Sequence, residues 1–390
     1  MKLLAPQRAV LTARGVRPLL TIGLFARLPI GMTALGLILL LRGAGRSYAL
    51  AGLADGAFAL GVGVAQPLLG RMVDRVGLRR VMLPLALAFP AGIVTIALAG
   101  KSAPAGALAA LAFATGALLP PVGAAMRAIW PQLVAPDLRA TAYSIEAIVQ
   151  ELTFIVGPPV VAALAASSSP RDALLATAAL GGGGAACFAL IAHRASERQP
   201  PARGHALQSA GARVVLTLSL LLGASFGSAE VAMPAFAEHH GARAAAGGLL
   251  AAVALGSLLG GVLFGTRTTE ANVIARLERG LVLCALTLAP LLLARSLAAM
   301  GVLMLVSGLP IAPTFAATYV LLDRVAVAGT ATETFAWNTT AIFAGAALGN
   351  ALGGVAIAAS SYRASLALAI AFGLLSGLLA LARSRELSLG

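Results

Sequence analysis

The chain has 390 residues, of which 59% are hydrophobic and only 11% charged, and its formal net charge is +14. Soluble globular proteins carry about 25% charged residues, so the composition excludes a soluble enzyme, a disordered chain and a collagen-like chain. The positive charge does not indicate nucleic-acid binding, because Lys and Arg of membrane proteins collect on cytoplasmic loops. The two cysteines, Cys187 and Cys284, both lie in apolar segments and predict neither a metal site nor a disulfide, but two buried thiols.

Twelve apolar segments of about 20 residues, the length that crosses a bilayer, follow one another along the chain. We expect them at 17–41, 47–70, 80–99, 103–129, 140–165, 173–192, 213–237, 245–266, 279–294, 297–321, 332–358 and 364–382. Most of the 28 Lys and Arg residues fall on the side of the N-terminus, which predicts that both termini are cytoplasmic. The fold class is therefore an all-α integral membrane protein with 12 transmembrane helices in two six-helix bundles.

The first segment carries a charge at mid-bilayer depth. Arg27 lies about 15 Å along the helix from Arg17, at 1.5 Å per residue. A charge at this depth costs about 3 kcal/mol on insertion scales and marks a functional site by default. Three interpretations stand: Arg27 pairs with Glu151 at similar depth in the fifth segment, it forms a fixed ion pair within one bundle, or it holds an anionic group of a substrate.

The second segment contains Asp55 in its outer third and ends in the most distinctive loop of the chain. Gly70 permits a close helix approach, and Gly77 permits a turn with positive φ. Asp74 can accept hydrogen bonds from the N-terminus of a neighbouring helix. The residues of this loop that we single out are Gly70, Asp74, Arg75, Gly77, Arg79 and Arg80.

The fifth segment holds three polar residues, Glu146, Gln150 and Glu151. The two glutamates are five residues apart, about 140° around a helix, so they cannot both face the same way. Further along, Phe154-Ile-Val-Gly157-Pro158-Pro159 combines a glycine with two prolines, which by themselves bend a helix.

The longest polar stretch separates the two halves of the chain. We predict an N-terminal six-helix bundle over 1–192, a cytoplasmic linker over 193–212 and a C-terminal six-helix bundle over 213–390. In the second half, Glu230 is a candidate proton carrier. Tyr319 and Trp337 can stack on an organic substrate, and Asn338 lies beside Trp337.

The two halves share a repeat. Gly116-Ala-Leu-Leu-Pro-Pro121 aligns with Gly308-Leu-Pro-Ile-Ala-Pro313 at an offset of 192, and the same offset brings Thr141-Ala-Tyr143 onto Glu333-Thr-Phe335 and Gly157 onto Gly349. Because six spans per half is an even number, this predicts a parallel repeat about an axis along the membrane normal. Compositional self-similarity is the alternative.

The loop over 70–80 resembles the Gly-x-x-x-Asp-Arg-x-Gly-x-Arg-Arg signature of the major facilitator superfamily. The resemblance implies that this loop latches the two halves together, with Asp74 facing the start of the eleventh segment at Thr330-Ala-Thr-Glu333. The second-half counterpart, Gly265-Thr-Arg267, departs from the signature. The Gly-Pro-Pro sequence at 157–159 resembles part of a motif of proton-driven exporters in this superfamily, without its further glycines.

The sequence thus predicts a multi-pass secondary transporter of the inner (cytoplasmic) membrane, and not an enzyme. We expect a monomer that moves a small molecule by alternating access, coupled to protons, with no cofactor, no metal and no nucleic-acid partner. Export is the favoured direction. Proton-linked uptake or facilitated diffusion of a nutrient is the alternative, and a receptor or scaffold that transports nothing is disfavoured.

Overall fold

The structure is a computed structural model that describes residues 5–100, 102–196, 204–242, 245–264 and 272–388. All regular secondary structure in these ranges is helical. The helices of the first half are α1 (Ala5–Thr12), α2 (Val16–Gly43), α3 (Tyr48–Val76), α4 (Leu78–Ala99), α5 (Ala105–Ala117), α6 (Val122–Leu133), α7 (Arg139–Ser167) and α8 (Pro170–Ser196). Those of the second half are α9 (Ala210–His239), α10 (Ala246–Phe264), α11 (Val273–Leu288), α12 (Leu297–Gly308), α13 (Ile311–Val325), α14 (Ala331–Ala359), α15 (Tyr362–Ala382) and α16 (Ser384–Ser388).

Eleven of the described helical segments are long and apolar enough to cross a membrane. The segment expected at 279–294 is not among them, because α11 has 16 residues and passes into the short 3-10 helix Ala289–Leu293. The segments expected at 103–129 and 297–321 are each divided into two helices, α5–α6 and α12–α13. Both divisions fall at the prolines of the repeated sequence, where the missing N–H groups interrupt the helical ladder.

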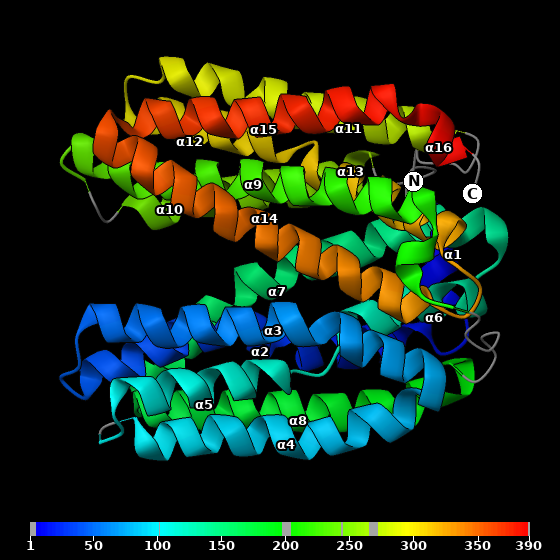
Figure 1. The fold of residues 1–390 in the computed structure, drawn as a ribbon, viewed down its shortest axis with the longest axis horizontal. Helices are drawn as coiled ribbons and strands as arrows, with labels where there is room; N and C mark the ends of the chain where they lie inside the picture. Colours follow the sequence, from blue (N-terminus) through cyan, green and yellow to red (C-terminus); the bar gives the residue numbers. More distant parts are fainter. Residues whose placement is uncertain (1–4, 101, 197–203, 243–244, 265–271, 389–390) are drawn as a thin grey trace.

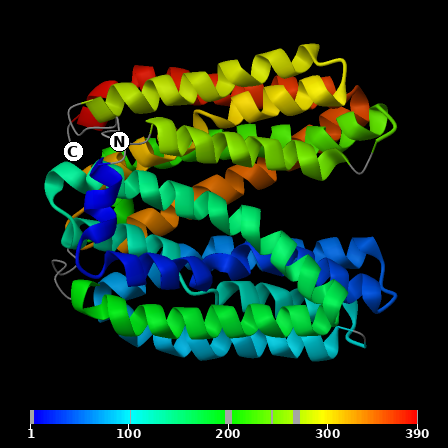
Figure 2. The same cartoon turned by 180° about the vertical axis from the view of Figure 1, so that it is seen from behind.

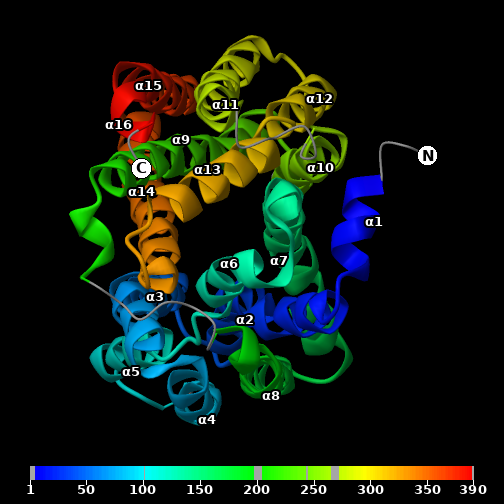
Figure 3. The same ribbon diagram turned by 90° about the vertical axis from the view of Figure 1, so that its right-hand side faces the viewer.

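The helices form two groups that lie one above the other, with α2 to α8 in the lower group and α9 to α15 in the upper group (Figures 1 and 3). Two long helices run obliquely between the groups: α14 crosses in front in Figure 1, and α7 crosses when the molecule is seen from behind in Figure 2. Helices α1 and α16 lie at the same end of the molecule, which we call the terminal end. At this end α3 finishes and α14 begins.

Glycines of the repeat have the same packing role in both groups. A Cβ at Gly61 of α3 would meet the backbone of Phe113 in α5, and a Cβ at Gly116 would meet the backbone of Phe58. In the second half the equivalent helices α10 and α12 cross in the same way, through Gly256 and Gly308. Gly116 and Gly308, which the alignment matches, therefore lie in two similar helix pairs in direct backbone contact.

Large apolar side chains cover the outside of the molecule. Leu87 on α4 is 77% exposed and Val355 on α14 is 68% exposed. An apolar exterior of this kind fits lipid rather than water. Cys284 is buried, as the sequence predicts, whereas Cys187 is exposed on α8.

Candidate functional site

A cluster of three charged side chains lies buried within the first group of helices. Arg27 of α2 approaches Glu146 of α7, with 2.7 Å between Nη1 and Oε1. Arg127 of α6 lies on the other side of the same carboxylate, with 3.7 Å between its Nε and Oε1. Arg27 and Glu146 are 1% and 0% exposed, and Arg127 is 4% exposed. Two guanidinium groups therefore share one carboxylate out of contact with the exterior.

Neutral polar groups complete the surroundings of this charge cluster. Trp130 of α6 donates its indole N–H to Glu146 Oε2 at 3.4 Å. Arg127 Nη2 donates to Gln150 Oε1 at 3.4 Å. From the second half, the ring of Tyr319 on α13 lies under the Arg127 guanidinium, 4.7 Å from its Cζ to the ring centroid. A cation over an aromatic face at this distance is an attractive contact, so the charge cluster reaches the boundary between the two halves.

An aromatic cluster surrounds Tyr319 at the boundary between the halves. The centroid of the Tyr319 ring lies 6.3 Å from that of Tyr143 on α7, 6.2 Å from that of Phe335 and 6.0 Å from that of Phe315. Phe226 of α9 extends the row, 6.2 Å from Phe315. The charge cluster thus has an apolar aromatic wall on one side, which suits a molecule with a charged group and a ring.

The repeat relates these contacts in pairs. At the offset of 192, Arg27 and Glu146 correspond to Ser219 and Asn338. Ser219 Oγ donates to Asn338 Oδ1 at 2.7 Å, so the second half makes a neutral hydrogen bond where the first half makes an ion pair. The fold therefore joins these two helices without charge in one half, and packing alone does not explain the charges in the other.

Two further pairs related by the repeat meet each other across the boundary between the halves. Arg127 corresponds to Tyr319, and these two side chains form the cation–π contact. Tyr143 corresponds to Phe335, and their ring centroids are 5.9 Å apart. Both pairs therefore lie close to the axis that relates the halves, where a transporter built from a parallel repeat has its substrate site.

The loop after α3 joins the two halves at the terminal end. The Asp74 carboxylate accepts the backbone N–H groups of Thr332 at 3.1 Å and Glu333 at 2.8 Å, in the first turn of α14. Gly70 lies against the same turn, where a Cβ would come within 2.9 Å of the Ala336 side chain. Gly77 has a φ of 95° between α3 and α4, a conformation that favours glycine. Arg75, Arg79 and Arg80 are exposed.

Other polar contacts between the halves lie near this loop or midway along the crossing helices. Arg139 of α7 is 3.9 Å from Asp323 of α13, beside a cavity of about 310 Å³ that Tyr143 and Val320 also line. Ser144 donates to the carbonyl of Gly261 at 3.4 Å, and Thr340 donates to the carbonyl of Gly63 at 2.7 Å. Together with the Asp74 contact, these polar contacts join the two halves.

Not every residue singled out from the sequence belongs to the charge cluster. The partner of Arg27 is Glu146 and not Glu151, because α7 turns Glu151 away toward Ser257 of α10. Glu230 is exposed on α9, and Asp55 is half-buried on α3. Trp337 is half-buried, and no hydrogen bond or ring contact joins it to the charge cluster among the described residues.

Sequence reasoning missed three members of the site, Arg127, Trp130 and Tyr143. Arg127 lies two residues before the end of the segment expected at 103–129, where a basic residue indicates the orientation of the chain rather than a site. The signal that identifies Arg127 and Tyr143 is the offset of 192, which places them opposite Tyr319 and Phe335.

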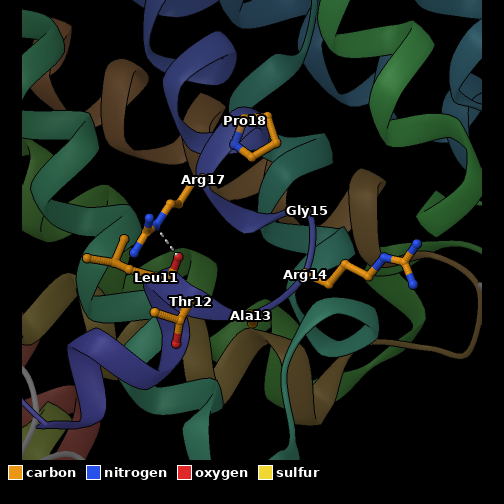
Figure 4. A pocket seen from close by; sticks show the side chains of 7 residues that line it. All are labelled: Leu11, Thr12, Ala13, Arg14, Gly15, Arg17 and Pro18. Atoms are coloured by element: carbon orange, nitrogen blue, oxygen red, sulfur yellow. Dashed lines mark hydrogen bonds between the residues drawn. The ribbon is translucent and has the colours of Figure 1, made fainter.

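A second cavity lies between α1 and α2, lined by Leu11, Thr12, Ala13, Arg14, Gly15, Arg17 and Pro18 (Figure 4). The Arg17 side chain folds back there and donates from Nε to the Leu11 carbonyl at 2.9 Å. This cavity contains no residue of the charge cluster. It is formed by the turn that connects the two helices.

The chain belongs to the Major Facilitator Superfamily, whose family description matches residues 19–332. It is a membrane transporter rather than an enzyme. No curated protein matches the chain.

Solved structures of the same fold cover nearly all of the chain. The human organic anion transporter MFSD10 (TETRAN) has 18% identity and a TM-score of 0.73, over 96% of this chain and 99% of that chain. A bacterial homologue of the iron transporter ferroportin, in an outward-facing state, has 16% identity and a TM-score of 0.79, over 95% and 100%. The E. coli fucose:proton symporter FucP has 14% identity and a TM-score of 0.64, over 95% and 99%.

Proposed function

We propose that the chain is a proton-coupled secondary transporter that exports a small molecule by alternating access. The observation that carries this proposal is the Asp74 carboxylate on the first turn of α14, a link between the halves that a rocking motion would break. With this link formed, the terminal end is closed. Opening it while the opposite end closes would expose the charge cluster and the aromatic cluster to each side in turn.

The units that move are the bundles 1–192 and 213–390, joined by the linker 193–212. The proposed topology has both termini in the cytoplasm and twelve membrane crossings, with α11 and the 3-10 helix after it forming the shortest. One chain contains the whole charge cluster together with its aromatic wall, so we propose a monomer as the working unit. The proposed location is the inner, cytoplasmic membrane.

Glu151 is the proposed proton carrier. It is half-buried, lies near Ser257 of the other half, and forms no ion pair with a described Arg or Lys. Taking up a proton would remove its charge when the halves close over it. Glu146, by contrast, is held by two arginines and a tryptophan within the first half.

The names of the fold neighbours do not choose a substrate. Their names give organic anions, iron, and fucose with a proton as substrates, and at 14–18% identity they share only the fold with this chain. The export direction rests on the partial Gly-Pro motif of α7, where Pro158 and Pro159 follow Gly157.

The test is transport in proteoliposomes with an imposed pH gradient and a pH-sensitive dye, screened against a panel of compounds. Proton movement opposite to the flux of a compound is the expected result. Movement in the same direction would instead assign proton-linked uptake, and flux without a pH response would assign facilitated diffusion. If no compound in a broad panel crosses the membrane, the transport proposal itself is wrong.

A further inference from the structure

We propose that the charge cluster binds the acidic group of an organic anion, and that the aromatic cluster holds the ring or apolar body of the same molecule. This inference rests on the proposed function, because it names the class of substrate for that transport site. It follows from three features of the cluster: donors without hydrogen-bond partners, the close approach of the two guanidinium groups, and charges that the fold does not need.

The first feature is that nitrogen atoms of both arginines make no hydrogen bond. Nε and Nη1 of both Arg27 and Arg127 make no hydrogen bond among the described residues, although both side chains are more than nine-tenths buried. Oε1 of Glu146, the ion-pair partner of Arg27 Nη1 and Arg127 Nε, likewise accepts no hydrogen bond. A buried donor without an acceptor costs about 1–3 kcal/mol, and more when it is charged. A structural ion pair would be expected to satisfy these donors, whereas a binding site keeps them for its ligand.

The second feature is the place where the two guanidinium groups approach each other. Gly123 on α6 lies between them, and a Cβ there would come within 3.1 Å of Arg127 Nη2 and 3.8 Å of Arg27 Nε. A methyl group at this position would crowd Arg127, so the glycine lets both guanidinium groups lie close to α6. Two guanidinium groups around one position can hold a carboxylate, sulfonate or phosphate through paired N–H donors.

The charge balance agrees with this geometry. The charged groups that act on Tyr319 at the edge of the cluster are Arg127, Glu146, Glu151 and Arg27. Glu146 is the only one of the two acids that pairs with the arginines, since Glu151 forms no ion pair with either in the described part of the chain. At contact distance, two positive groups therefore face one negative group, and an anion would supply the missing charge.

The third feature is the comparison between the halves. The second half joins the equivalent helices through Ser219 and Asn338, without charge. At the position equivalent to Arg127 it has Tyr319, whose ring covers the guanidinium. In the conformation described here the ring thus occupies one face of Arg127. When the halves separate, that face is released and the body of the ligand can replace Tyr319 there.

The experiment compares five probes that share one aromatic body: the anions naphthoate, naphthalenesulfonate and naphthyl phosphate, the neutral naphthamide and the cation naphthylmethylammonium. Thermal unfolding of the purified full chain in detergent measures binding, since a ligand that binds only the folded state raises Tm. We expect naphthoate, naphthalenesulfonate or naphthyl phosphate to raise Tm, with no comparable effect from the amide or the ammonium compound. This comparison needs only the wild-type protein, so it stands even where a variant fails to fold.

Variants then assign the effect to the cluster. Arg127→Gln is expected to weaken the apparent affinity for the anion about 10- to 100-fold, the loss of a charged hydrogen-bonding partner, and Arg127→Lys to restore part of it. Arg295→Gln removes an equal charge from an exposed position and should leave the affinity unchanged. Equal losses in Arg127→Gln and Arg295→Gln would overturn the assignment, as would a wild type that no anion in the series stabilises.

Flux in proteoliposomes separates this inference from the proposed function. Transport of neutral or cationic compounds without any preference for anions would overturn the anion site and leave the transporter proposal intact. Binding of the anions without flux of any compound would support the site and contradict transport.

Discussion

Asp74 and Glu333 meet across the two halves of the molecule, with the carboxylate of the first accepting the backbone N–H of the second at 2.8 Å. Replacing the carboxylate by an amide, in Asp74→Asn, removes one of the two acceptor oxygens and the negative charge at the N-terminus of α14. It should weaken the closed terminal end by about 0.3–1 kcal/mol. We expect normal insertion and abundance but slower transport. Asp137→Asn, at an exposed acid, is the charge-matched control.

The accessibility of the closed end can be measured directly for this latch. Ser144→Cys places a thiol at a buried contact between α7 and α10, in a background where both native cysteines are replaced by serine. Alkylation of this thiol should be faster in Asp74→Asn than in the parent. An unchanged alkylation rate together with wild-type transport would show that Asp74 is not a latch.

A second prediction concerns the buried ion pair of Arg27 and Glu146. Arg27→Ala leaves a buried carboxylate with less compensation and should lower stability by about 3–5 kcal/mol. The double variant Arg27→Ser with Glu146→Asn, which copies the pair found in the second half, should recover much of that loss. Thermal unfolding in detergent compares the three proteins. A double variant less stable than Arg27→Ala would mean that the two halves do not tolerate the same pair.

A third prediction separates the two acids proposed for coupling. Glu151→Gln should abolish transport driven by a pH gradient while binding persists, because the amide has the shape of the protonated acid but cannot titrate. Glu230→Gln, at an exposed position on α9, should remain driven by the gradient. The assay is substrate flux with and without the gradient. Full coupling in Glu151→Gln would remove it from the mechanism and make Asp55 and Glu146 the next acids to test.

A fourth prediction uses the glycines at the helix crossings. Gly61→Ala forces a methyl group against the Phe113 backbone, and overpacking of this kind costs about 1–3 kcal/mol. Gly56→Ala on the same helix meets nothing within 4 Å and should be neutral or stabilising by up to about 1 kcal/mol. In the second half, Gly256→Ala and Gly248→Ala form the same contrast. Equal melting temperatures within each pair would contradict the packing described here.

A fifth prediction tests the contact between Arg127 and Tyr319. Tyr319→Phe keeps the aromatic face and should behave like the wild type in conformational exchange. Tyr319→Leu removes the cation–π contact, worth about 0.5–2 kcal/mol, and should favour separation of the halves. The rate of Ser144→Cys alkylation reports the difference. If the phenylalanine and leucine variants change that rate equally, the ring face makes no contribution.

The sequence predicts the helical membrane fold and the order of its segments because apolar length and charge position are properties of each segment alone. It does not predict the breaks between α5 and α6 or between α12 and α13 as such. The repeated Gly and Pro residues at both places mark them, but the apolar run continues through each break. The sequence also does not predict how short α11 is. Its apolar sequence continues past Leu288, where the α-helix passes into the 3-10 helix Ala289–Leu293.

The site was less predictable, because depth along a helix is readable from sequence and direction around it is not. Arg27 and Glu151 lie at similar depth, yet the 140° between Glu146 and Glu151 decides which acid faces α2. Tyr319 was identified from its residue type, but its contact with Arg127 depends on how two repeated halves are arranged around a common axis. Such a contact between halves becomes visible only once the offset of 192 is applied to every polar position.

The charged residues of the cluster, Arg27, Arg127 and Glu146, all belong to the first half of the chain. The contact that the second half makes with them among the described residues is the aromatic face of Tyr319. In a transporter that works as proposed, no ion pair has to be pulled apart at the site when the halves move. The first half would hold the ligand in a fixed site, and the second half would move across that site to cover or expose it. The rate of the transport cycle would then be set at the terminal end, where the contact between Asp74 and α14 breaks.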